Sequence, residues 1–172
     1  MDEVEVARKA INGDEEAFVA LMQLHKEALL RTALAFLKNE HDALEALQET
    51  TYRAFRKIHT LKEPAYAKTW LIRITINYCQ DQLKKDKHYV RDGESAESTV
   101  SLDSTQLELQ EALSTLSADE QHLIHMKYFQ GVKIKEIAAI EKIPEGTVKS
   151  RLHKTLRTLR SHFEGKGEMD NV

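Results

Sequence analysis

The chain has 172 residues, of which 41% are hydrophobic and 31% charged, and its formal net charge is −3. This composition excludes a disordered chain, and the length suits one ordinary domain or two small ones. The single cysteine, Cys79, excludes an internal disulfide, and no apolar run approaches the roughly 20 residues of a membrane span. We therefore expect a cytoplasmic protein without membrane insertion.

The charged residues form four blocks of alternating sign. Residues 1–52 hold 5 basic and 11 acidic residues, and residues 53–91 hold 10 basic and 3 acidic ones. Residues 92–132 hold 1 basic and 8 acidic residues, and residues 133–172 hold 9 basic and 6 acidic ones. The two basic blocks predict two separate surfaces that attract phosphate, although charged runs also simply solvate helices.

The scarcity of proline, glycine and alternating β-branched residues predicts an all-α fold. An amphipathic pattern covers residues 14–38, and a short helix is expected before it. Asp42 followed by Glu45 matches a capping box for the next helix, which is expected to end near Ile58.

A loop is expected at residues 59–66, because Pro64 lies there and the apolar periodicity is lost. A further helix follows at about residues 67–87, with Trp70 on its apolar stripe. Together these helices can close a bundle, so we expect an N-terminal domain of residues 1–87.

Residues 88–105 hold four acids against one base and have little apolar periodicity, which predicts a flexible linker. A second helical domain is expected at residues 106–163, where Ser117 and Glu120 form another capping box. Gly131 suits a left-handed helix cap in this domain. A disordered tail is expected at residues 164–172.

The end of the second domain predicts a helix-turn-helix. Residues 134–140 have the spacing of one buried helical face, and a short break follows at residues 141–143. Pro144 suits the first turn of a new helix. A basic second helix after a tight turn is what enters a major groove, so double-stranded DNA is the expected partner.

The first turns of this second helix would reach the base edges. Gly146 allows close approach to the DNA backbone, and Arg151 suits a bidentate contact to guanine. Lys149 and Lys154 suit phosphate contacts, and a solvated basic helix is the alternative. The candidate residues for this duplex are Pro144, Glu145, Gly146, Thr147, Lys149, Ser150, Arg151 and Lys154.

Three segments in this order resemble bacterial sigma-70-type RNA polymerase sigma factors. The resemblance covers about residues 10–163, and the short chain with two helical units resembles the extracytoplasmic-function group. The segments are similar to the family's polymerase-binding helix at residues 42–50 and 53–56, to its −10-element helix at residues 69–74 with Asn77, and to its −35-reading helix at residues 143–153.

The resemblance implies a subunit that binds core RNA polymerase and reads the −35 element as duplex. RNA synthesis would belong to the core, so we expect no enzymatic activity, no cofactor and no small-molecule substrate. An anti-sigma factor is a further expected partner. For the apolar members of the polymerase surface, ordinary packing within the bundle is the alternative. The implied polymerase-binding residues are Asp42, Glu45, Leu47, Gln48, Glu49 and Phe55.

The first basic block is expected to capture the melted −10 strand through residues 59–85. Aromatic stacking or a loop pocket would trap unpaired bases there. For Trp70, core packing is the competing interpretation, because a lone tryptophan on an apolar stripe is usually buried. The candidate residues are Lys62, Tyr66, Lys68, Trp70, Arg73, Asn77, Lys84 and Lys85.

Two positions depart from the family pattern. Lys142 stands where a turn glycine is usual, and Lys133 stands where a Ser or Thr cap is usual. We expect no metal site, because His122 and His125 lack a third ligand at a suitable spacing.

Two alternative functions remain at this point. One is a stand-alone helix-turn-helix regulator whose N-terminal bundle dimerises or binds a small ligand. The other is a helical interaction protein that binds no nucleic acid. A regulator would not need the motif at residues 42–55 beside a basic block.

Overall fold

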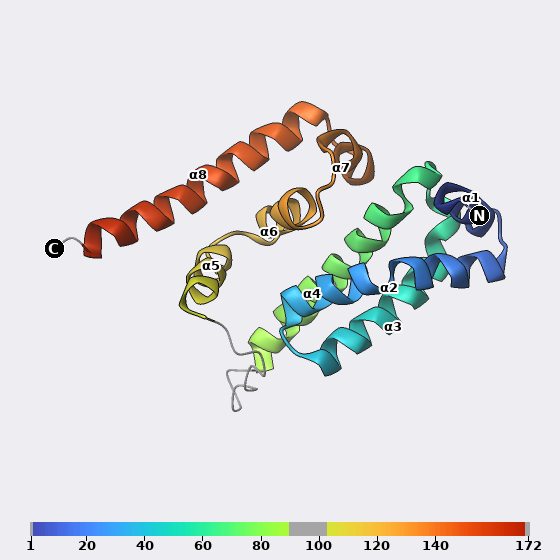
Figure 1. Ribbon diagram of the computed structural model, residues 1–172, viewed down its shortest axis with the longest axis horizontal. Coiled ribbons are helices and arrows are strands. Elements are labelled where there is room, and N and C mark those ends of the chain that lie inside the picture. Colours follow the sequence, from blue (N-terminus) through green and yellow to red (C-terminus); the bar gives the residue numbers. More distant parts are fainter. Residues whose placement is uncertain (1, 90–102, 171–172) are drawn as a thin grey trace. The chain divides into compact units, whose positions relative to one another are not determined.

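The computed structural model describes residues 2–89 and 103–170, and all regular structure in these ranges is helical (Figure 1). The all-α prediction is therefore confirmed. Contacts group the chain into two compact units, residues 1–100 and residues 101–172. Most of the predicted linker, residues 90–102, lies outside the described residues.

The first unit is a bundle in which α2 packs against α1, α3 and α4, and α3 also packs against α4 (Figure 1). Leu21, Leu29, Leu71, Ile72 and Ile76 are fully buried in it. Burial of each such side chain stabilises the fold by about 1.5–3 kcal/mol. The elements are α1 (Glu3–Ile11), α2 (Glu15–Leu37), α3 (Glu40–Lys57), the 3-10 turns η1 (Ile58–Thr60) and η2 (Pro64–Tyr66), and α4 (Ala67–Tyr89).

The start of α3 differs from the prediction. Asn39, and not Asp42, is the N-cap, and its Oδ1 accepts a hydrogen bond from the backbone N–H of Asp42 at 2.8 Å. The reason is that Asn39 has the extended backbone that a cap needs, whereas Asp42 already lies in the first turn. The capping box at Asp42 and Glu45 is therefore wrong, although the helix itself is confirmed.

The second unit holds the predicted helix-turn-helix. Ser117 and Glu120 form the predicted capping box, and Gly131 has a positive φ of 66°. Met126, Ile137 and Val148 are fully buried in this unit. Its elements are α5 (Ser104–Ser114), α6 (Ala118–Ile124), the π turn η3 (His125–Phe129), α7 (Ile134–Glu141) and α8 (Glu145–Asp170).

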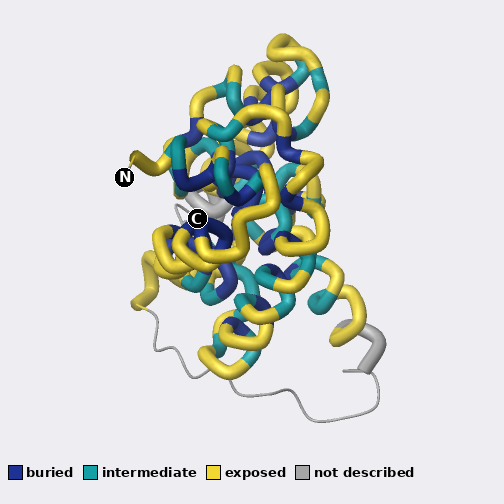
Figure 2. The backbone as a smooth tube through the Cα atoms, turned by 90° about the vertical axis from the view of Figure 1, so that its right-hand side faces the viewer, coloured by how far each residue is buried: buried dark blue, intermediate teal, exposed yellow. Residues whose placement is uncertain are grey.

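Helix α8 is longer than expected. It continues to Asp170, so the disordered tail predicted at residues 164–172 is helical up to that residue. No proline follows to stop it, and each of Gly165 and Gly167 costs only about 1 kcal/mol in a helix. Along the helices of both units, buried and exposed residues alternate in the pattern of amphipathic helices (Figure 2).

Candidate polymerase and nucleic-acid interfaces

The start of α8 is fixed by its buried side. The carbonyl oxygen of Pro144 accepts hydrogen bonds from the N–H groups of Thr147 and Val148, at 3.0 and 3.2 Å. Val148 and Leu152 are buried at 0% and 5% exposure, and α8 packs on α6 and α7. The opposite side of the helix therefore points out of this unit.

The outward side of α8 carries most of the predicted duplex-reading residues. Only Thr147 among them is half-buried. A Cβ placed on Gly146 would meet nothing within 4 Å, so internal packing does not require the glycine there. Ser150 donates a hydrogen bond to the Gly146 carbonyl at 3.0 Å. The exposed members are Pro144, Glu145, Gly146, Lys149, Ser150, Arg151 and Lys154.

Arg151 lies beside the buried stripe of α8, three residues after Val148 and directly before Leu152. Lys149 borders the stripe on its other side, directly after Val148, and the centre of the outward side is occupied by Gly146, Ser150 and Arg157, at spacings of four and seven residues. The sequence interpretation did not name His153 and Arg157 as contacts, although this same spacing could have identified them.

Glu120 ties α6 to α8. It closes the capping box of α6, and its Oε2 lies 3.3 Å from the hydroxyl of the buried Thr155 on α8. A hydrogen bond from the backbone N–H of Ser117 lowers the pKa of Glu120 and thereby stabilises its ionised carboxylate. This contact joins α6 to the part of α8 that follows its first turns.

The turn before α8 has the left-handed conformation for which a glycine is preferred. Lys142 has φ 57° and ψ 43°, which costs a residue with a Cβ on the order of 1 kcal/mol. Lys133 precedes α7 without any side-chain cap hydrogen bond. Both departures seen in the sequence therefore correspond to local features that lower the stability of this unit.

In α4 the candidate residues occupy two sides. Arg73, Asn77 and Lys84 share one side, because spacings of four and seven residues return to the same face of a helix. Lys68 lies about 140° or more around the helix from them, at about 100° per residue. Burial lowers the pKa of His25 on α2, the nearby carboxylate of Glu3 raises it, and the positive charge of Lys68 lowers it further. Lys68 therefore lies near α2.

The remaining −10 candidates differ in how far they are exposed. Trp70 begins the same side as Arg73 but is buried at 9% exposure, as the core-packing interpretation holds. Tyr66 is half-buried in η2, while Lys62 and Lys85 are exposed. The expected loop at residues 59–66 contains the two 3-10 turns η1 and η2, because Pro64 suits a first helical position and the Glu63 side chain caps η2.

The fully buried side chains of α3 are small, and three of its large apolar side chains are exposed. Its buried residues are Ala43, Ala46, Thr50 and Ala54. Small residues let helices approach closely and leave the large apolar side chains outside. Exposed apolar groups close together are typical of protein interaction surfaces. The exposed ones are Leu44 at 42%, Tyr52 at 56% and Phe55 at 50%.

Of the predicted polymerase-binding residues, Glu45, Gln48 and Phe55 are exposed. Asp42, Leu47 and Glu49 are half-buried. The ring of Phe55 also meets that of the buried Phe18, with centroids 5.3 Å apart.

Two arginines of α3 are held in place but were not predicted as contacts. The Arg53 Nε lies 3.2 Å from Glu49 Oε1, and its guanidinium lies 5.2 Å from the ring centroid of Tyr78 on α4. Arg56 lies over the ring of Tyr52 at 5.6 Å. Spacings of four residues, Glu49 to Arg53 and Tyr52 to Arg56, were the available signal.

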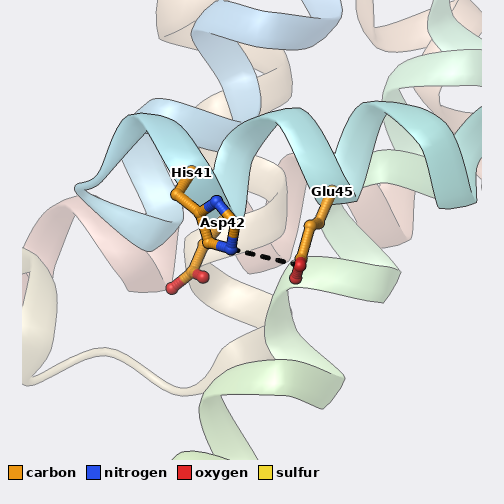
Figure 3. A group of neighbouring side chains, drawn as sticks. All are labelled: His41, Asp42 and Glu45. Carbon is orange, nitrogen blue, oxygen red and sulfur yellow. Dashed lines mark ion pairs between the residues drawn. The ribbon is translucent and has the colours of Figure 1, made fainter.

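The first turn of α3 gathers a histidine and two carboxylates (Figure 3). His41 Nε2 lies 3.3 Å from Glu45 Oε1, and Asp42 Oδ2 accepts a hydrogen bond from Asn39 Nδ2 at 2.7 Å. The side chains of His41 and Glu45 are 82% and 58% exposed. Acidic groups at a helix N-terminus are stabilised by the helix dipole, which opposes a bound cation. We therefore assign these side chains to the polar surface of α3.

The two histidines considered as metal ligands have structural partners. His122 Nε2 lies 2.8 Å from Glu141 Oε1, which links α6 to α7. His125 stacks on Phe129 with ring centroids 5.4 Å apart, and its Nε2 lies 3.0 Å from the side-chain nitrogen of Gln130. Burial lowers the pKa of His125 to about 4, so its ring is neutral at neutral pH.

Comparison with known proteins identifies the family of this chain. The family model "Sigma-70 region 2" matches residues 21–97, and "Sigma-70, region 4" matches residues 106–159. RNA polymerase sigma factor SigV of Bacillus subtilis is 33% identical over 140 residues, with 79% of this chain and 84% of that protein covered. The ECF RNA polymerase sigma factor SigL of Mycobacterium tuberculosis is 30% identical over 171 residues, with 91% and 97% covered. The chain belongs to the sigma-70 family, in its extracytoplasmic-function group.

Solved structures share the fold of this sigma factor. CnrH, solved in complex with the cytosolic domain of CnrY, has a TM-score of 0.66 and 22% identity, covering 95% of this chain and 97% of that chain. The sigma factor RpoE of Bartonella quintana, in complex with the anti-sigma factor NepR, has a TM-score of 0.61 and 25% identity, covering 86% and 96%. Within the described part of the chain, none of the helices has the length and apolar character to cross a membrane.

Proposed function

We propose that this sigma factor divides its work among three surfaces. Helix α3 binds core RNA polymerase, the exposed side of α4 holds the melted −10 strand, and the first turns of α8 read the −35 duplex. The chain itself is a non-catalytic initiation factor, as its family membership implies. Because bacterial transcription takes place in the cytoplasm, the protein would act there.

The observation that carries this proposal is the packing of α3. The fully buried positions of the helix hold only alanine and threonine, whereas Tyr52, Phe55 and Arg56 remain exposed and accessible to a partner. Aromatic residues and arginine are the side chains that contribute most to protein interfaces. A stand-alone regulator would leave this surface, and the match to region 2, without a role.

An anti-sigma factor is the second partner in this proposal. The solved relative from Bartonella quintana carries one in its crystal structure. In this chain the exposed apolar groups of α3 offer such a protein a surface that the polymerase also needs. Binding of one partner would therefore exclude the other.

Binding of purified core polymerase to the full chain tests the α3 assignment. We expect Gln48→Ala and Phe55→Ala to weaken binding, because both exposed side chains would be buried by the partner. Glu16→Ala, at an exposed position of α2, is the matched control and should bind as wild type. Equal affinity of all these proteins would contradict the assignment of α3.

A further inference from the structure

A buried pair of hydroxyl groups joins α3 to α4. Thr50 and Thr75 are both fully buried, and their Oγ1 atoms lie 3.1 Å apart. Thr75 also donates to the carbonyl oxygen of Leu71 at 3.0 Å. Because a threonine hydroxyl has one proton, Thr50 is the donor in the contact between the two helices.

The pair lies beneath the two surfaces of the first unit. Thr50 follows Gln48 and Glu49 directly in α3, and Thr75 stands between Arg73 and Asn77 in α4. Two positions along a helix correspond to about 200°, so the buried Thr75 lies on the side of α4 opposite to the half-buried Arg73 and the exposed Asn77. The contact therefore connects the buried side of the polymerase-binding helix to the buried side of the strand-binding helix.

The surroundings of this contact give it a particular importance. The other buried residues of α3 are Ala43, Ala46 and Ala54, whose methyl groups pack without directional preference. A small rotation or slide of α3 would change these apolar contacts gradually, but it would break the directional hydrogen bond. A buried hydroxyl without its partner is costly, so one register of the two helices is selected.

We propose that Thr50 and Thr75 are positioning residues for promoter opening. Their hydrogen bond fixes the register of α3 against α4, so that α4 is held at a defined place when α3 is bound to polymerase. The melted strand then meets Arg73 and Asn77 in the correct position. This inference rests on the function proposed above, because it assigns α3 to polymerase and α4 to the strand.

A double valine variant can show whether the hydrogen bond affects promoter opening independently of the stability of the fold. In Thr50→Val with Thr75→Val both hydroxyls are replaced by groups of similar shape, which is close to neutral for folding. We expect this double variant to bind core polymerase within about twofold of wild type but to open promoter DNA about tenfold more slowly, the scale of one directional hydrogen bond. Permanganate reactivity of promoter thymines measures the opening, and thermal unfolding measures stability.

Thr51→Val is the matched control on the same helix. Its hydroxyl donates to the Leu47 carbonyl oxygen of α3 itself, at 2.8 Å, so its loss should leave opening unchanged. Opening by the double valine variant at the wild-type rate would overturn the inference, since the pair would then only fill space.

A second pair of variants covers the case in which the double valine protein unfolds. Thr50→Ser retains the hydroxyl and Thr50→Ala removes it, while both lack the methyl group. We expect the serine variant to open promoters faster than the alanine variant, and equal rates would overturn the inference. A wild-type protein that starts no transcript with core polymerase would instead contradict the proposed function itself.

Discussion

Two residues of the second unit, Lys142 and Arg151, can each be tested by a single substitution. Lys142 adopts a left-handed conformation in the turn that orients α8, and Arg151 lies at the edge of the outward side of α8. The backbone of the first residue affects the stability of the turn before α8. For the second residue, the proposed function implies a contact to a base of the −35 duplex.

Lys142→Gly is expected to stabilise the protein by about 1 kcal/mol, because glycine has no Cβ to clash in the left-handed conformation. Thermal unfolding of the full chain measures this effect. Lys142→Ala is the control, since it removes the charge but keeps the Cβ, and it should not raise the unfolding temperature. A gain of equal size in both variants would show that charge, and not backbone conformation, is responsible.

Arg151→Ala should weaken binding to a −35 duplex by about 1–3 kcal/mol, because a bidentate arginine recognises guanine. Its effect on binding to a duplex of random sequence should be much smaller. Lys149→Ala should weaken binding to both duplexes equally. It should also reduce the slope of the logarithm of the binding constant against the logarithm of the salt concentration by about 1. Fluorescence anisotropy at several salt concentrations measures both effects. If the two variants behave identically, the assignment of Arg151 to base reading is wrong.

At the scale of the helices, the sequence predicted which helices exist and in which order, but it predicted the residues at which they begin and end less well. The capping box at Ser117 was visible because all its groups lie within four residues. The true cap of α3 was missed because Asn39 and Asp42 are both good cap residues and only the backbone distinguishes them. The opposite placement of Lys68 and Arg73 follows from helix geometry alone and could have been predicted.

Contacts between distant helices were beyond the reach of sequence patterns. Thr50 and Thr75 are 25 positions apart, and nothing in either local pattern pairs them. The sequence pattern likewise does not distinguish the π turn η3 from a regular helix, because its residues have ordinary helical propensities. Whether Trp70 packs in the core also depends on contacts with other helices, so its burial could be stated only as an alternative.

The turn η3 makes the stability of the chain depend on pH. Burial lowers the pKa of His125 from 6.5 to about 4, so the unfolded chain binds its proton more readily than the folded one. Stability should therefore decrease as the pH falls from about 6.5 toward 4. Chemical unfolding at several pH values should show a weaker decrease in His125→Gln. His59→Gln, at an exposed position, is the control and should unfold with the wild-type pH dependence.

On the scale of the whole molecule, each unit carries its own basic block. Residues 53–91 hold 10 basic residues and belong to the first unit, and residues 133–172 hold 9 and belong to the second. Helix α3, for which we propose binding to polymerase, belongs to the first unit. Each unit by itself therefore has a phosphate-attracting surface, but promoter recognition requires both to act on one DNA molecule.

Run-off transcription with purified core polymerase and promoter fragments from the protein's own genome tests this account most directly. Addition of the full chain should produce discrete transcripts that core polymerase alone does not make. Gln48→Ala and Arg151→Ala should each reduce these transcripts, and excess polymerase should restore the first variant only. Absence of any transcript dependent on the wild-type chain would contradict the account.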